Sequence, residues 1–113
     1  MMVVVGADTR DAFAGIAVGD VDVLESAVGL HETNRESSGL DGRTFALVKI
    51  AALIALDAPA CSYASQVTNA LEEGVTPEDL LGVLRAIAPQ VGGPRVMAAA
   101  PEIMAAMGVP LSG

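Results

Sequence analysis

The sequence predicts an all-α protein, and three observations carry that prediction. Residues 44–56 are almost all apolar or good helix formers and carry one charge, Lys49. The tetrapeptide Thr76-Pro77-Glu78-Asp79 is typical of a helix start. No segment alternates apolar and polar residues as a half-buried strand does. We therefore expect a bundle of about five to six helices built around a buried apolar helix.

The length and composition indicate one domain that associates with copies of itself. The chain has 113 residues, a length that suits a single domain. Its hydrophobic fraction of 52% is high for a small protein, whose surface is large relative to its volume. Some apolar surface should therefore stay uncovered on one subunit, and such surface usually marks an interface. We expect a homo-oligomer.

The charge balance argues against two classes of partner. The formal net charge is −8, from 14 acidic and 6 basic residues. Nucleic-acid-binding domains usually carry a basic surface, and an acidic balance disfavours anionic membranes. Residues 44–56 are too short to span a bilayer, which takes about 20 apolar residues. The sequence starts without the basic region and long apolar run of a signal peptide, so we expect a cytoplasmic protein.

The N-terminal residues 1–20 are expected to be an extension or a short helix, and residues 21–113 a single helical domain. Asp8 could cap a helix through Ile16 that buries Phe13 and Ile16. The glycines of this segment could equally leave it loose.

A helix is predicted over residues 21–37. Leu24, Ala27, Val28 and His31 repeat there at helical spacing, and Ser37-Ser38-Gly39 ends the pattern.

The apolar helix over residues 44–56 should be buried on all sides, because it shows no polar stripe. Asp41 is its expected N-cap. The helix should stop near Asp57, which we expect to cap the next helix, with Pro59 in its first turn. That helix is predicted over residues 59–73, and Gly74 stands where a left-handed residue ends a helix.

The sharpest local pattern follows. Thr76 is the expected N-cap of a helix in which Pro77 holds the first position and Asp79 returns a hydrogen bond. Pro89 should bend or end this helix, and Gly92-Gly93-Pro94 should form a turn. A last helix is expected over residues 95–107, interrupted or restarted at Pro101 and stopped by Gly108. The apolar face of the helix after Thr76 is formed by Leu80, Leu81, Val83, Leu84 and Ile87.

The order of these segments over residues 40–108 resembles the carboxymuconolactone decarboxylase family, which includes alkylhydroperoxidase D-like proteins. The resemblance implies an all-helical bundle that assembles into trimers or hexamers. The matching residues are Ala70, Leu71, Gly74, Val75, Thr76, Glu78, Asp79, Leu80, Leu84, Gly92 and Pro94.

The resemblance also implies where reactive residues would stand. The redox branch of the family carries two cysteines three residues apart, a histidine four residues after the second, and the helix-ending glycine eight residues later. Counted back from Gly74, these positions hold Pro59, Ser62 and Gln66. The decarboxylase branch also keeps a histidine that aligns with Gln66. Glutamine does not transfer protons at neutral pH, and serine does not replace a thiolate.

Two side chains are catalytic candidates. Cys61, the only cysteine, could be a reactive thiol near a helix N-terminus or a small buried residue. His31, the only histidine, could act as an acid or base or bond to a neighbour on its helix. One cysteine excludes an internal disulfide, and one cysteine and one histidine make no metal site, so we expect neither metal nor cofactor.

Polar residues near the family's reactive positions are ligand-pocket candidates. Ser62, Tyr63 and Gln66 could line a pocket, since Tyr63 and Gln66 share a helix face. Alternatively, Tyr63 packs in an interface and Gln66 satisfies a buried backbone group. Lys49 should extend its stem along apolar surface, and Arg95 should be a solvated charge at a helix start.

Two classes of function follow. The first is a non-redox family member that binds a small ligand or only assembles. The second is a family-type enzyme, a thiol peroxidase or lactone decarboxylase, that uses residues not identified in the sequence.

Overall fold

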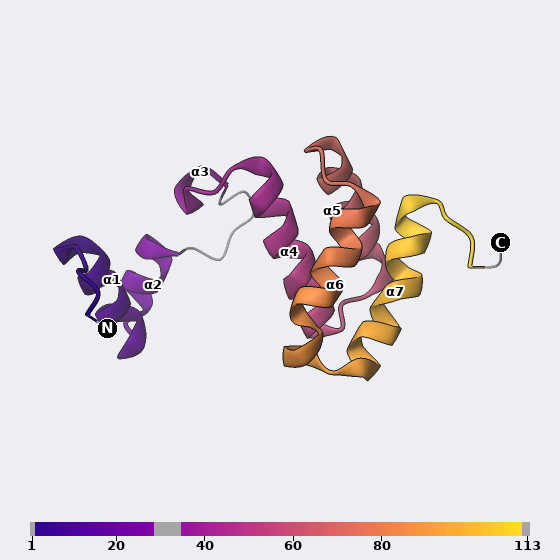
Figure 1. Cartoon of the computed structure of the whole chain (residues 1–113). Coiled ribbons are helices and arrows are strands. Elements are labelled where there is room, and N and C mark those ends of the chain that lie inside the picture. Colours follow the sequence, from indigo (N-terminus) through magenta and orange to yellow (C-terminus); the bar gives the residue numbers. More distant parts are fainter. Residues whose placement is uncertain (1, 29–34, 112–113) are drawn as a thin grey trace. The chain divides into compact units, whose positions relative to one another are not determined.

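Helices make up all the regular structure that this computed structural model describes, namely residues 2–28 and 35–111 (Figure 1). The predicted all-α class is confirmed. Seven helices occur in these ranges, slightly more than predicted, because two short ones lie where a single helix was expected over residues 21–37. The chain divides into two compact units, Met1–Gly39 and Leu40–Gly113.

The first unit holds α1 (Ala7–Ala17), α2 (Val21–Ala27) and α3 (Arg35–Ser38). Asp20 caps α2, since its carboxylate accepts a hydrogen bond from the Val23 N–H at 3.1 Å. The segment between α2 and α3, with His31, lies outside the described residues. The expected domain boundary between residues 20 and 21 stays a prediction.

Helices α1 and α2 contact each other but bury no residue completely. A Cβ on Gly15 would lie 2.5 Å from a methyl carbon of Val23, so this glycine permits the close approach. Of the two alternatives for this segment, the helix forms, but it does not bury Phe13, whose side chain is 70% exposed, and it buries Ile16 only partly. Asp8 is not the cap either, since α1 begins after Gly6 without a side-chain cap.

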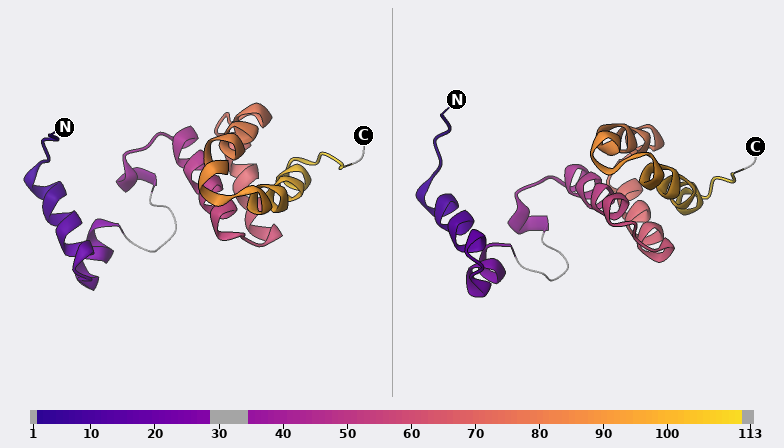
Figure 2. Two further views of the ribbon diagram at one scale, coloured as in Figure 1. Left: turned by 60° about the horizontal axis from the view of Figure 1, so that its bottom comes forward. Right: turned by 90° about the horizontal axis from the view of Figure 1, so that it is seen from below.

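The second unit is a bundle of α4 (Gly42–Leu56), α5 (Ala60–Glu72), α6 (Pro77–Val91) and α7 (Gly93–Met107). Helix α4 contacts the other three, and α7 packs against both α5 and α6. Figure 2 shows α4 and α5 running side by side, with α6 and α7 packed against them.

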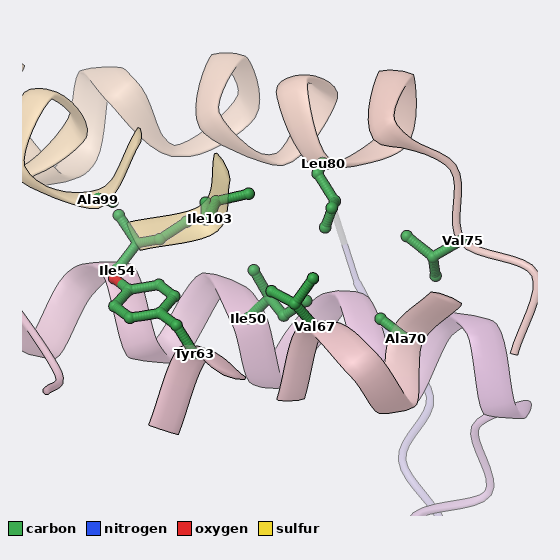
Figure 3. Close-up of a cluster of buried hydrophobic side chains, with 9 residues drawn as sticks. All are labelled: Ile50, Ile54, Tyr63, Val67, Ala70, Val75, Leu80, Ala99 and Ile103. Atoms are coloured by element: carbon green, nitrogen blue, oxygen red, sulfur yellow. The ribbon is translucent and has the colours of Figure 1, made fainter. Parts of the chain in front are cut away.

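The core of the bundle draws on all four helices (Figure 3). Ile50 and Ile54 of α4 are fully buried, as is Val67 of α5, and Leu80 of α6 is 1% exposed. Burying each such side chain stabilises the fold by about 1.5–3 kcal/mol. The remaining buried apolar residues are Tyr63, Ala70, Val75, Ala99 and Ile103.

The prediction that α4 is buried holds for one of its sides only. Ile50 and Ile54 have no exposed surface, whereas Val48 is 52% and Leu56 75% exposed. The three other helices of the bundle cover the first side and leave the second apolar side open.

The end of α5 fixes the direction of the chain toward α6. Gly74 adopts a left-handed conformation with φ 87°, as predicted. Its N–H donates to the Leu71 carbonyl at 3.1 Å, and the Val75 N–H donates to the Ala70 carbonyl at 3.0 Å. This pair of bonds is the Schellman motif, in which a residue past the helix end packs back on the helix. Val75 does so and is 3% exposed.

Two predicted caps are confirmed at the starts of α4 and α6. The Asp41 carboxylate accepts a hydrogen bond from the Thr44 N–H at 2.7 Å. The Thr76 hydroxyl accepts from the Asp79 N–H at 3.0 Å, and the Asp79 carboxylate accepts from the Thr76 N–H at 2.9 Å. These last two bonds form a capping box, which satisfies two otherwise unpaired donors.

Asp79 also joins α6 to α4, because its carboxylate pairs with the Arg43 guanidinium at 2.7 Å. The hydrogen bond from the Thr76 N–H, followed by that from Arg43, lowers the pKa of Asp79 below its ordinary value of 3.8. The carboxylate therefore stays charged at neutral pH and keeps both contacts.

Two prolines lie inside helices. Pro89 does not end α6, which was one of its two predicted effects, and the predicted interruption at Pro101 is wrong. Helix α6 continues past Pro89 to Val91, and α7 runs through Pro101 without interruption. A proline frees the carbonyl four residues earlier, here Arg85 and Met97. Both of these residues are exposed, so water can bond the freed groups. Of the expected Gly92-Gly93-Pro94 turn, only Gly92 lies outside a helix, with φ 87°. It ends α6 and directly precedes α7, which begins at Gly93.

Gly108 ends α7 in a left-handed conformation, as predicted. No described helix combines the length and the apolar character needed to cross a membrane. Leu81, expected on the apolar face of α6, is 46% exposed, whereas Leu80 beside it is buried.

The capping box predicts the effect of a substitution at Thr76. Thr76→Ala removes the acceptor of the Asp79 N–H and should lower the free energy of unfolding by about 1 kcal/mol. Urea denaturation followed by circular dichroism measures this change.

Thr68→Ala is the matched control. The Thr68 hydroxyl donates to the Ala64 carbonyl at 2.8 Å within its own helix and caps nothing, so its loss should change stability by less than about 0.5 kcal/mol. An unchanged midpoint for Thr76→Ala would mean that the cap is redundant.

Candidate functional site

The positions at which the family resemblance implies reactive residues lie at the start of α5, after a sharp turn from α4. Asp57 ends α4 in the left-handed conformation, at φ 53°. A short polar side chain tolerates this conformation better than most. The Ala58 N–H then donates to the Leu53 carbonyl at 3.0 Å. The expectation that Asp57 caps α5 is therefore wrong, because its backbone already serves as the end of α4.

Pro59 takes the cap position of α5, in an extended conformation and without a side-chain cap. The Ser62 N–H donates to the Pro59 carbonyl at 3.0 Å, which places these two residues in the same helical turn. Gln66 follows one turn later on the side of Ser62. The three positions thus form a row at a helix start, occupied by a ring, a hydroxyl and an amide.

Tyr63 faces the core, unlike its polar neighbours. Its side chain is 2% exposed and lies with Ile54, Ala99 and Ile103 in the buried cluster (Figure 3). Ser62 and Gln66 are partly buried. The structure therefore brings Ser62 and Gln66 together on one flank of α5 and turns Tyr63 toward α4 and α7.

The surroundings of Tyr63 keep its hydroxyl neutral. Burial raises the pKa of Tyr63 above its ordinary value of 10.0, and the carboxylates of Asp57 and Glu102 raise it further. Both effects disfavour a phenolate. At neutral pH the group can donate or accept a hydrogen bond but cannot act as a base.

Of the two catalytic candidates, Cys61 lies within the described residues and His31 does not. Cys61 is the second residue of α5 and is an exposed free thiol, so the alternative of a buried cysteine is wrong. Its neighbours three and four residues along the helix are Ala64 and Ser65. His31 lies outside the described residues.

The basic side chains Lys49 and Arg95 lie in different surroundings. The Lys49 ammonium lies 5.1 Å from the centre of the Phe45 ring, at cation–π distance, with its side chain partly buried. Arg95 is exposed in the first turn of α7.

A hollow of about 430 Å³ lies in the other unit, between α1 and α2. It is lined by Asp11, Ala12, Asp22, Val23, Ser26 and Ala27, none of which is a candidate from the sequence. Within the described ranges, no three side chains of His, Cys, Asp or Glu gather as a metal ion would require.

Sequence reasoning missed the acidic neighbours of Tyr63. Glu102 lies on α7 and Asp57 before α5, and only the packing of α7 on α5 brings Glu102 near. No local pattern marks such a pairing. The ion pair of Arg43 with Asp79 was missed for the same reason.

Comparison with known proteins supports the resemblance. Residues 22–105 match the model of the carboxymuconolactone decarboxylase family. This range begins in α2, earlier than the resemblance over residues 40–108, and ends within α7. Neither the curated proteins nor the solved structures contain a match to this chain. Since the matched range takes in most of the chain, this protein belongs to the carboxymuconolactone decarboxylase family.

Proposed function

We propose that this chain is a non-redox member of its family that works as a homo-oligomer, a trimer or hexamer, with Ser62 and Gln66 available to contact a small ligand. The observation that carries the proposal is the row of Pro59, Ser62 and Gln66 at the start of α5. These are the positions at which the family resemblance implies two cysteines and a histidine. A ring, a hydroxyl and an amide supply neither thiol chemistry nor proton transfer.

The exposed thiol of Cys61 does not replace the missing pair. A peroxidatic cycle needs a thiolate that attacks the peroxide, and a second thiol that resolves the resulting sulfenic acid as a disulfide. The chain has one cysteine, and Ala64 and Ser65 follow it on the helix. Only Cys61 of a second copy could supply the resolving sulfur.

Assembly is supported by apolar surface that the four helices of the bundle leave open. Leu56 and Met97 are each 75% exposed and Val48 52% exposed, on helices that carry the bundle core on their other sides. Exposed apolar side chains in such numbers are typical of protein interfaces. Tyr63 argues against a large pocket at this place, because its ring lies in the core of its own bundle.

Ligand contact at Ser62 and Gln66 is supported by their partial burial on one flank of α5. A hydroxyl and an amide one helical turn apart can both donate and accept hydrogen bonds. They suit a small polar, uncharged ligand better than an ion. The alternative function, a thiol peroxidase or lactone decarboxylase, would need reactive residues other than these.

The proposed assembly predicts the mass of the protein in solution. Light scattering coupled to size exclusion should give an assembly larger than one chain at micromolar concentration, because the exposed apolar side chains favour association. A stable monomer under these conditions would contradict the proposed assembly.

The second prediction concerns turnover. In a coupled peroxide assay with a dithiol reductant, the wild type should consume peroxide no faster than Cys61→Ser, because the chain has no second thiol. Turnover in the wild type that vanishes in Cys61→Ser would contradict the non-redox proposal and support the peroxidase alternative.

The third prediction tests the alignment of positions 59, 62 and 66. Pro59→Cys, Ser62→Cys and Gln66→His, combined with Cys61→Ser, should give two thiols in one helical turn that form a reducible disulfide under mild oxidant. Mass spectrometry after alkylation detects the bond.

A control places the second cysteine elsewhere on α5. Ala64→Cys, with Pro59→Cys and Cys61→Ser, sets the thiols on different sides of the helix and should leave both free. If the first variant is folded and its thiols also stay free, the alignment counted from Gly74 is wrong.

A further inference from the structure

Two carboxylates and a hydroxyl lie at the end of the bundle where α4 passes into α5. Asp57 stands three residues beyond the buried Ile54, and Glu102 stands three residues beyond the buried Ala99 on α7. Ile54, Ala99 and Tyr63 belong to one buried cluster, so the two carboxylates stand beside the same tyrosine. Their electrostatic effect on its hydroxyl has the same origin.

The Tyr63 hydroxyl is open to a ligand although its ring is buried. The side chain is 2% exposed, and in Figure 3 its ring lies at one end of the buried cluster, with the oxygen pointing away from Ile50 and Val67. Among the residues that the structure describes, none forms a hydrogen bond with this hydroxyl. In the same ranges no fully buried polar side-chain atom is left without a partner, so the Tyr63 oxygen reaches the surface of the bundle.

Among the described residues of the bundle, no cation pairs with these two carboxylates. The Arg43 guanidinium pairs with a carboxylate of α6, and the Lys49 ammonium lies over an aromatic ring of its own helix. Arg85 and Arg95 are exposed on α6 and α7. The pair of carboxylates therefore adds local negative charge to a chain whose formal net charge is already −8, and this charge favours a cationic ligand.

The three groups suit an organic ammonium ion better than a metal ion. A primary ammonium has three N–H donors, and two carboxylates with one hydroxyl offer an acceptor for each of them. A metal ion such as Ca²⁺ takes about six to eight oxygen ligands, and within the described ranges no third His, Cys, Asp or Glu joins the two carboxylates. Tyr63 keeps its proton at neutral pH, so its hydroxyl can donate to one carboxylate while its oxygen accepts from the ammonium.

We propose that Asp57, Tyr63 and Glu102 form a binding site for a small primary amine in its ammonium form. The ammonium lies between the two carboxylates and against the Tyr63 oxygen. Because this tyrosine is almost fully buried among three helices, a small molecule reaches its oxygen more easily than a side chain held on another protein. The site uses neither Ser62 nor Gln66, so the inference goes beyond the proposed function and does not rest on it.

Tyrosine fluorescence tests the proposal directly, because the chain has one tyrosine and no tryptophan. Titration of the full chain with n-butylamine, at neutral pH and constant ionic strength, should change the Tyr63 emission in a saturable way. Tetramethylammonium carries the same charge without an N–H donor, and n-butanol carries a similar carbon chain without a charge. Neither of these two compounds should give a saturable change.

Matched charge variants locate the site. Asp57→Asn and Glu102→Gln each remove one charge and should weaken butylamine binding by about tenfold or more, because each removes a charge-assisted hydrogen bond. Asparagine tolerates the left-handed conformation of residue 57, so the first variant keeps the end of α4. Glu72→Gln is the control, because it makes the same chemical change at an exposed residue at the other end of α5 and should leave the affinity unchanged.

Tyr63→Phe tests the hydroxyl. This variant keeps the ring in the core and should bind butylamine about tenfold more weakly, because the ammonium loses one acceptor. Calorimetry replaces fluorescence as the measurement, since the variant has no tyrosine. Circular dichroism checks the helical content of every variant, and the second carboxylate variant carries the test if the first loses its helices.

The outcomes separate this site from charge screening and from assembly. No saturable change with butylamine, an equal response to tetramethylammonium, or an equal loss in Glu72→Gln overturns the proposal. Unchanged affinity in a folded Asp57→Asn, Glu102→Gln or Tyr63→Phe also overturns it. A fall in the mass of the assembly in Asp57→Asn, at unchanged helical content, would mean that a basic side chain of a second copy fills the site, and this too overturns it. The mass and peroxide measurements on the wild type test the proposed function separately, so either proposal can fail alone.

Discussion

Burial of one side of α4 is the constraint on which the bundle depends. Ile50 and Ile54 belong to the buried cluster to which α5, α6 and α7 all contribute, and neither has any exposed surface. Helices α5 and α7 also pack together, and their Tyr63 and Ile103 lie in the same buried cluster as Ile54 (Figure 3). The ion pair of Arg43 with Asp79 then aligns the starts of α4 and α6. Apolar burial thus supplies the bundle's stability, and the polar contacts at the helix ends set how its helices align.

Local chemistry predicted most helix ends correctly, because a cap is decided by the few residues next to it. Asp41 and Thr76 cap their helices as expected, and Gly74 and Gly108 end theirs. Packing decided the exceptions. Asp57 was assigned to α5 from its residue type, whereas the chain uses it as the left-handed end of α4. Pro89 was expected to bend or end its helix and Pro101 to interrupt the next. Neither helix ends at its proline, and the carbonyls that the prolines free belong to exposed residues, where the cost of a missing bond is small.

In the candidate site, too, the positions of residues along the helix could be predicted from the sequence, but their surroundings could not. Counting from Gly74 placed Pro59 and Ser62 in one turn at a helix start, and the backbone agrees. Counting residues back from Gly74 gives the position of a residue along its helix but not the side chains that surround that residue. Tyr63 therefore entered the pocket candidates as a helical neighbour of Gln66, although its ring lies in the core beside Ile54 and near Glu102 of α7. The apolar character of α4 likewise predicted burial without saying that the other helices of its own bundle would cover only one side.

The junction between α6 and α7 limits how this protein can vary. Gly92 alone ends one helix and precedes the next, so no loop absorbs a change in chain length there. An inserted residue that joined either helix would turn the residues beyond it by about 100° about the axis. An insertion that joined α7 would carry Ala99 and Ile103 out of the core, and one that joined α6 would do the same to Leu80. From Pro77 to Met107 a change in chain length therefore disturbs the core more than a substitution at an exposed position does.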